Sequence, residues 1–175
     1  GFMISESGIA NDLYKMFHVL FGGLKGGLAI GTMFMMVAIS AMNGLSVAGM
    51  AIGATIALPE MLKRNYDKRM ITGVVQAGSS LGILIPPSVV MVLYGMIARQ
   101  PVSKLWMAGI LPGLLMASLF LIYIYVRCKL QPELGPPLKK EEREVSTLEK
   151  IRLLKAGIIP FLIFFFMTGL FLMGI

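Results

Sequence analysis

Long uncharged segments alternate with short basic ones along the chain. The longest of them, residues 26–59, contains no charged residue over 34 positions. One straight helix of that length would measure about 51 Å, whereas the hydrocarbon core of a bilayer is about 30 Å thick. The segment is therefore too long for one crossing and too short for two complete crossings. Because the turn-forming pair Asn43-Gly44 lies at its midpoint, the pattern predicts a re-entrant helical hairpin over residues 26–64.

A second uncharged segment, residues 70–98, is interrupted at its centre. The interruption reads Gly78-Ser79-Ser80-Leu81-Gly82-Ile83-Leu84-Ile85-Pro86-Pro87-Ser88. Two consecutive prolines deprive the carbonyls one turn earlier of their donors, so an unbroken helix cannot continue through them. We therefore expect a broken transmembrane helix over 65–99, helical at about 70–79 and 87–98 and unwound between.

The remaining segments complete an all-α integral membrane fold. The aromatic residues Trp106, Tyr123 and Tyr125 lie near the two ends of one apolar run and are typical of the interfacial belts of a membrane span. The expected elements are an interfacial amphipathic or scaffold helix within 1–25, a scaffold transmembrane helix at 105–126, a cytoplasmic basic loop at 127–155, and the start of a further transmembrane helix at 156–175.

The composition supports a membrane protein and excludes most other classes. Hydrophobic residues make up 57% of the 175 residues and charged residues only 14%, whereas about a quarter of the residues of a soluble domain are charged. The mean hydropathy is +0.81. A single cysteine, Cys128, excludes an internal disulfide. Both ends interrupt an apolar pattern, which is typical of a segment from a longer chain.

The distribution of positive charge predicts the orientation in the membrane. Fourteen of the 16 lysine and arginine residues fall on one side of the expected spans, and only Arg99 and Lys104 fall on the other. The positive-inside rule makes the first side cytoplasmic. The net charge of +7 is therefore interpreted as a topology signal, and we expect no nucleic-acid partner because no recognisable nucleic-acid-binding module is present.

The two interruptions carry the candidate chemistry. Unwinding a helix at membrane depth leaves backbone groups without partners, and this persists only where protein, water or an ion satisfies them. Carbonyl and hydroxyl oxygens suit a hard cation such as Na⁺, and helix N-termini suit an anionic group. No Asp, Glu, Lys or Arg lies within the uncharged segments, which argues against a proton pump built on buried carboxylates. The alternatives are packing kinks, a channel-like pore or an inactive fragment; an enzyme is not expected, because no nucleophile–base pair or metal cluster appears.

Three stretches resemble a known family. They are the interruption Gly78–Ser88 quoted above, Ala57-Leu58-Pro59-Glu60-Met61-Leu62-Lys63-Arg64-Asn65-Tyr66, and Ala108-Gly109-Ile110-Leu111-Pro112-Gly113-Leu114-Leu115. In order and spacing they are similar to the large membrane subunit, of the DctM type, of tripartite ATP-independent periplasmic (TRAP) transporters. The chain resembles the N-terminal half of that subunit.

The resemblance implies a multi-pass permease of the bacterial inner membrane. Such a permease imports organic anions, for example C4-dicarboxylates, with Na⁺ as the coupling ion. The implied partners are a periplasmic substrate-binding protein, a small membrane subunit of the DctQ type, the remainder of the large subunit and the lipid bilayer. The implied fold is one repeat of an inverted-repeat elevator, in which each repeat has a re-entrant hairpin and a broken helix.

The resemblance also implies which residues bind ion and substrate. The Na⁺ site would use Asn43, Gly44 and Ser46 at the hairpin tip with Gly78, Ser79 and Gly82 at the break, and the anion would lie near Ser80, Pro86, Pro87 and Ser88. The tip departs from the family pattern Ser-Gly-Ser-Ser. Because Leu45 has no hydroxyl, the family's hydroxyl ligand at that position has no counterpart here.

Overall fold

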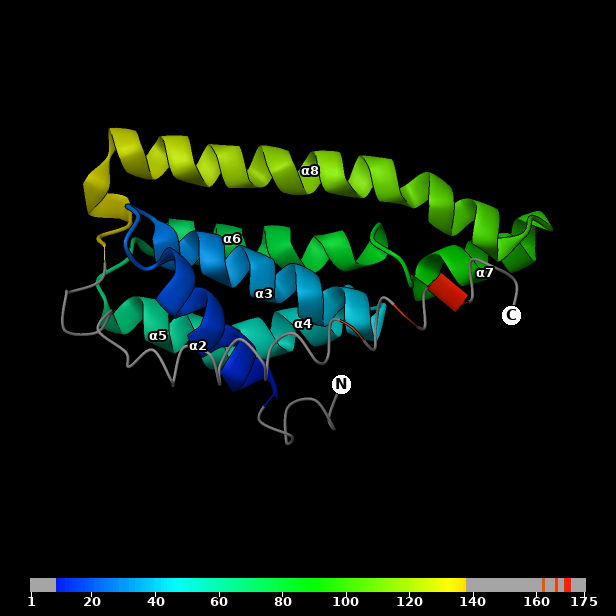
Figure 1. The fold of residues 1–175 in the computed structure, drawn as a ribbon, viewed down its shortest axis with the longest axis horizontal. Helices are drawn as coiled ribbons and strands as arrows, with labels where there is room; N and C mark the ends of the chain where they lie inside the picture. Colours follow the sequence, from blue (N-terminus) through cyan, green and yellow to red (C-terminus); the bar gives the residue numbers. More distant parts are fainter. Residues whose placement is uncertain (1–8, 138–161, 163–165, 167–168, 171–175) are drawn as a thin grey trace.

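The computed structural model describes residues 9–137, 162, 166 and 169–170. Every regular element in these residues is helical (Figure 1), as the sequence predicts. In chain order the elements are α2 (Ile9–Phe21), α3 (Gly27–Asn43), α4 (Ser46–Ile52), the π-helical turn η1 (Gly53–Ala57), α5 (Leu58–Lys63), α6 (Lys68–Ser80), the 3₁₀ turn η2 (Leu81–Ile83), α7 (Val89–Ala98), α8 (Val102–Leu130) and the 3₁₀ turn η3 (Pro132–Leu134).

Helix α3 and the arm formed by α4, η1 and α5 run side by side in opposite directions (Figure 1). The reversal takes two residues. Gly44 has a left-handed φ of 65°, and its N–H donates to the carbonyl of Ser40 at 2.8 Å, which ends α3. Leu45 is extended, with φ −133° and ψ 126°. The Asn-Gly pair thus lies at the tip of the hairpin, and Lys63 lies at its open end.

Small residues bring the two arms of the hairpin into close contact. A β-carbon on Gly53 would lie 2.5 Å from the sulfur of Met36, and one on Gly49 would overlap the hydroxyl of Ser40. Met36 and Ser40 are fully buried on α3. Gly-x-x-x-Gly pairs allow helices to approach closely, and Gly49 and Gly53 form such a pair on this arm.

The second helical unit is interrupted between α6 and α7. Helix α6 starts after Asp67, whose Oδ1 accepts from the backbone N–H groups of Arg69 at 2.9 Å and Met70 at 3.1 Å. It ends at Ser80 and passes through η2 into a non-helical link at 84–88. Helix α7 begins at Val89, two residues later than expected, because Ser88 is extended and caps it by accepting from the N–H of Met91.

Helix α8 is about 43 Å long at 1.5 Å per residue, and it is the helix in the described residues that is long and apolar enough to cross a membrane. Pro112 lies inside it, and the helix bends along its N-terminal part (Figure 1). It extends past the expected span at both ends, so residues 127–130 are helical and the predicted basic loop starts later. Most of that loop, residues 138–155, most of the expected helix at 156–175, and residues 1–8 lie outside the described residues.

Helix α2 packs along α3. Tyr14, Met16 and Phe17 are buried, and the ring of Phe34 on α3 stacks on Phe17 and Phe21 with centroids 5.7 and 5.3 Å apart. In the described part of the chain, α3 therefore covers the apolar face of this amphipathic helix.

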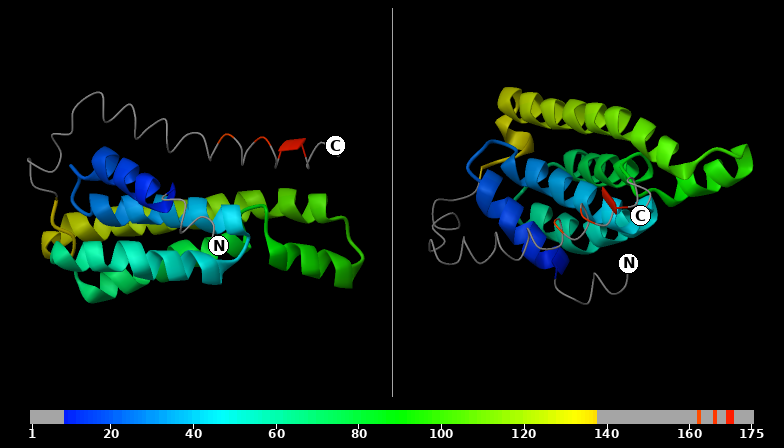
Figure 2. Two further views of the ribbon diagram at one scale, coloured as in Figure 1. Left: turned by 90° about the horizontal axis from the view of Figure 1, so that it is seen from below. Right: turned by 45° about the vertical axis from the view of Figure 1, so that its right-hand side comes forward.

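The C-terminal end of α8 is tied to the open end of the hairpin. The N–H of Gly26 donates to the carbonyl of Gly135 at 2.9 Å, and the N–H of Asp67 donates to that of Leu134 at 3.2 Å. At the other end of the molecule, α7 and the start of α8 extend beyond the hairpin (Figure 2). The hairpin tip therefore lies part-way along α8.

Candidate ion and substrate site

The two interruptions lie against each other. The backbone N–H of Val89, at the start of α7, donates to the carbonyl of Gly44 at the hairpin tip, at 3.2 Å. A β-carbon on Gly44 would lie 2.8 Å from the carbonyl oxygen of Pro87. The tip therefore rests directly on the link between α6 and α7 (Figure 1), although more than 40 residues of chain separate them.

Glycines also hold the end of α6 against α3. A β-carbon on Gly78 would lie 2.5 Å from Cβ of Met36, and one on Gly82 would lie 2.5 Å from Cβ of Ser40. Both glycines are thus required for close packing. Gly78 lies inside α6, within the helical stretch that the sequence predicts, and Gly82 lies in η2, at the start of the break.

Three predicted serines lie around the break with different partners. Ser79 is fully buried, and its hydroxyl lies within donating distance of two carbonyls, that of Val75 at 2.8 Å and that of Gln76 at 3.0 Å. Ser80 is partly buried and donates to Ala77 at 2.8 Å. Ser88 is fully buried and caps α7. In Ser79 and Ser80 the hydroxyl hydrogen is used within the helix, and the oxygen lone pairs remain available to a cation.

Prolines free further oxygens at the break. Pro86 and Pro87 have no N–H for the carbonyls four residues earlier, those of Gly82 and Ile83. Gly82 packs directly on the carbonyl of Ser40, because a β-carbon on this glycine would lie 3.1 Å from that oxygen. The backbone at the break therefore lies directly against the end of α3, and no ionisable residue lies in 43–46 or 78–88.

Ser40 is a member of this region that the sequence pattern did not indicate. It is fully buried, and among the described residues its hydroxyl has no hydrogen-bond partner. It lies between Gly49 on α4 and Gly82 in η2. An unpartnered buried hydroxyl costs free energy, which makes it a candidate ligand. Its sequence signal was weak, since a serine three residues before the tip looks like an ordinary helix residue.

Trp106 corrects the expectation of an interfacial aromatic belt at that end of α8. It is only 8% exposed, and its indole N–H donates to the carbonyl of Ser88 at 3.3 Å. Gly109 and Gly113 extend the same contact, because β-carbons there would lie 2.7 Å from the carbonyl oxygen of Leu84 and 3.0 Å from the side chain of Ile85. Helix α8 therefore packs along the link.

The remaining predicted residues are at the edge of the site or outside it. Ser46 is half-buried at the start of α4. Asn43 ends α3, and its side chain lies outside the described residues. Charge lies away from the site, at the open end of the hairpin, where Glu60 pairs with Lys63 at 3.2 Å and with Arg64. The hydrogen bond from Arg64 holds the pKa of the Glu60 carboxyl below its usual range.

The whole chain, residues 1–175, matches the family model described as the DctM component of the tripartite ATP-independent periplasmic transporter. The chain belongs to this family. It is 35% identical over 126 residues to the C4-dicarboxylate TRAP transporter large permease protein DctM of Pseudomonas aeruginosa. The matched residues make up 72% of this chain and 30% of that protein. It is 33% identical over 117 residues to the ectoine TRAP transporter large permease protein TeaC of Halomonas elongata, covering 67% and 27%.

This DctM-family chain spans less than a third of the length of these relatives. Another similar protein, the sialic acid TRAP transporter permease protein SiaT of Haemophilus influenzae, is 29% identical over 66% of this chain. The relatives are transporter permeases, so the family is one of membrane transporters, as the resemblance implied. The substrates in their names differ, although they share this segment.

Proposed function

We propose that this chain forms part of the permease subunit of a Na⁺-coupled secondary transporter of the bacterial inner membrane. The transporter would import a small organic anion that a periplasmic binding protein delivers. The observation that carries the proposal is the hydrogen bond between Val89 and Gly44, which brings the hairpin tip and the broken helix together. Two interruptions serving only as separate kinks would not need to share contacts.

The proposed Na⁺ site is built from neutral oxygens. Its candidates are the hydroxyls of Ser79, Ser40 and Ser46, the side chain of Asn43, and backbone carbonyls near Gly44, Gly78 and Gly82. Hard cations prefer such oxygen ligands. The buried hydroxyl of Ser40, without a partner among the described residues, supports a bound cation in this region, because coordination would offset its burial.

The proposed anion site lies next to it, at the start of α7. The N-terminal end of a helix favours negative charge, and α7 is ten residues long. In this proposal, Ser80, Pro86, Pro87 and Ser88 would line the approach to this end from the link. A carboxylate there would neutralise the adjacent Na⁺, which gives a physical reason for coupled binding of the two.

The proposal extends to the assembly. The hairpin and the broken helix would form one repeat of an inverted-repeat elevator, completed by the rest of the large subunit. A small subunit of the DctQ type is the expected partner; one relative, 32% identical over 71% of this chain, is named as the isethionate TRAP transporter permease protein DctMQ of Oleidesulfovibrio alaskensis. Because relatives are named for C4-dicarboxylates, ectoine and sialic acid, we propose an organic solute of this range.

Substitution of single oxygen ligands tests the proposal. In the transporter assembled from this chain, the rest of the large subunit, the small subunit and the binding protein, Ser79→Ala and Asn43→Ala should each raise the Na⁺ concentration for half-maximal uptake. We expect about tenfold, as for about 1.4 kcal/mol of lost binding. Ser118→Ala is the matched control, because that hydroxyl lies on the exposed face of α8 and donates only to Leu114.

The same preparation distinguishes the alternatives. Uptake into proteoliposomes that requires both a Na⁺ gradient and the binding protein supports a coupled transporter, whereas passive conductance would identify a channel-like pore. The 175 residues reconstituted alone should show no uptake, since half of an inverted-repeat site is absent from them. Unchanged Na⁺ dependence in both Ser79→Ala and Asn43→Ala would exclude the proposed shared ion site.

A further inference from the structure

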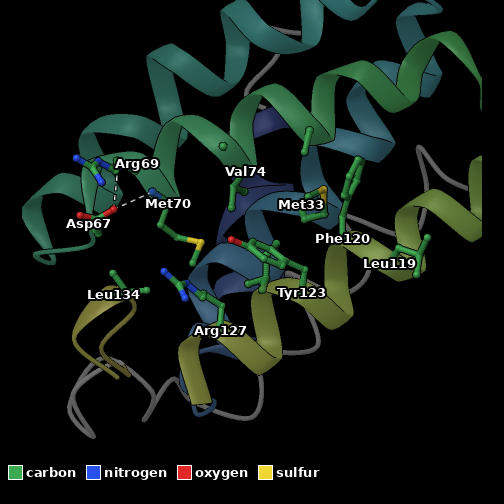
Figure 3. Close-up of a pocket in the computed structure, with 13 residues that line it drawn as sticks. Met33, Asp67, Arg69, Met70, Val74, Leu119, Phe120, Tyr123, Arg127 and Leu134 are labelled. Atoms are coloured by element: carbon green, nitrogen blue, oxygen red, sulfur yellow. Dashed lines mark hydrogen bonds between the residues drawn. The ribbon is translucent and has the colours of Figure 1, made fainter. Parts of the chain in front are cut away.

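A cavity of about 650 Å³ lies between α6 and α8, away from the break. Its size is in the range of small-molecule and cofactor sites. The walls are mostly apolar and include Val74 and Ala77 from α6, Phe120 and Ile124 from α8, and Met33 from α3 (Figure 3). It is independent of the residues assigned to Na⁺ and substrate.

One end of this cavity is basic. Arg69 at the start of α6 and Arg127 in the last turns of α8 line it, together with Asp67. One oxygen of Asp67 already accepts two backbone N–H groups at the start of α6. Within the part of the chain that the structure describes, neither arginine forms an ion pair; the ion pairs there join Lys63 and Arg64 to Glu60. The cavity end therefore carries a net positive charge.

The direction of the Arg127 side chain makes its charge available to a ligand. In Figure 3 the guanidinium of Arg127 and the hydroxyl of Tyr123 point into the space between the two helices. Guanidinium groups bind phosphate with two parallel hydrogen bonds. The same end of the molecule holds Lys63, Arg64 and Lys129, the side to which the positive-inside rule assigns the cytoplasm.

The combined chemistry is that of a lipid. An apolar cavity at membrane depth accommodates an acyl chain, and a basic end at the cytoplasmic surface accommodates an anionic headgroup. A soluble anion would gain nothing from the apolar walls. A neutral apolar chain would leave the arginines without a counter-ion.

The geometry points to a binding site for one anionic phospholipid. Its phosphodiester would lie beside Arg127, at the end of the cavity that Arg69 also lines, and one acyl chain would extend along Val74, Ala77 and Phe120. The lipid would fill the space between α6 and α8 and hold these helices at their present separation.

The test measures lipid retention in the purified transporter by native mass spectrometry. Delipidated protein in detergent is titrated with phosphatidylglycerol, with phosphatidylcholine and with glycerol 3-phosphate, which lacks acyl chains. We expect phosphatidylglycerol to bind at least fivefold more tightly than phosphatidylcholine, and glycerol 3-phosphate not to bind measurably.

Three variants locate the site. Arg127→Gln should weaken phosphatidylglycerol about fivefold, the factor that corresponds to about 1 kcal/mol per basic residue. Lys129→Gln is the control, since it removes the same charge from the same helix end but lies over Tyr125 and outside the cavity. Gly73→Leu places a larger side chain in the apolar part of the cavity, at a position where a β-carbon meets nothing within 4 Å, and it should weaken the binding of phosphatidylglycerol and of phosphatidylcholine alike.

Three results would overturn the assignment. Equal weakening by Arg127→Gln and Lys129→Gln would mean that surface charge alone attracts the lipid. Unchanged lipid binding in Gly73→Leu would mean that the cavity is not a lipid site. Loss of subunit assembly in this variant without loss of lipid would mean that protein occupies the cavity in the complete transporter.

Discussion

Ser40 combines complete burial with a hydroxyl that has no hydrogen-bond partner among the described residues. Leaving such a group unsatisfied costs about 1–3 kcal/mol. The residue is surrounded by glycines on two other elements, so an alanine would fit in the same space. A function in ion binding therefore predicts that Ser40→Ala reduces the stabilisation given by Na⁺, whereas a function in packing alone predicts no such reduction.

For Ser40→Ala we expect thermal stability without Na⁺ to stay the same or to rise, because an unsatisfied buried hydroxyl is removed. If Ser40 is a ligand, the stabilisation that added Na⁺ gives should fall in this variant. The measurement is the unfolding midpoint in detergent with and without Na⁺. An equal Na⁺-induced shift in wild type and variant would exclude the residue from the site.

Gly44→Ala should destabilise the protein by about 1–2 kcal/mol or more. Its φ of 65° is left-handed, which costs about that much for a residue with a β-carbon, and the carbonyl of Pro87 lies 2.8 Å from the added atom. Gly73→Ala is the matched control. It lies inside α6 with open space around it and should stabilise by about 0.5–1 kcal/mol. Thermal unfolding of both variants in detergent provides the comparison, and equal midpoints would contradict it.

At the scale of elements, α8 and the link between α6 and α7 are held together by Trp106. Trp106→Phe keeps an aromatic ring but removes the donor to the Ser88 carbonyl, so we expect a loss of about 0.5–1.5 kcal/mol. Tyr125→Phe, which removes a polar atom from an exposed position on the same helix, should change stability by less than about 0.5 kcal/mol. If the two variants had the same thermal unfolding midpoint, the indole N–H of Trp106 would contribute nothing to stability.

The sequence predicted the elements whose causes are local. The length of the uncharged segment and the pair Asn43-Gly44 were sufficient to indicate a hairpin, and Pro86-Pro87 indicated the interruption after α6. The burial of Trp106 and the environment of Ser40 depend on which elements pack together, which no local pattern contains. The π-helical turn Gly53–Ala57 was likewise not anticipated, because hydrophobic spacing over five residues does not distinguish it from an α-helical turn.

At the scale of the whole molecule, the hairpin should open toward one side of the membrane. Single cysteines at Lys25 and Lys63 should both react with an impermeant thiol reagent from the cytoplasmic side, and a cysteine at Lys104 only from the other side. All three positions are exposed. The native Cys128 is fully buried and serves as an internal control for leakage or unfolding. Labelling of positions 25 and 63 from opposite sides would exclude a re-entrant hairpin.

The hydrogen bonds from Gly26 to Gly135 and from Asp67 to Leu134 bear on the speed of any motion of α8 relative to the hairpin and α6. Each hydrogen bond contributes about 0.5–1.5 kcal/mol net. If both must break in the rate-limiting step, the motion would be about 5- to 150-fold slower. They join backbone atoms, so among the natural residues proline alone deletes the donor. Gly26 has φ 73°, which proline cannot adopt, whereas Asp67 has φ −61°, which suits it. Asp67→Pro would therefore be the substitution that speeds this motion, and it would also remove the side-chain cap of α6.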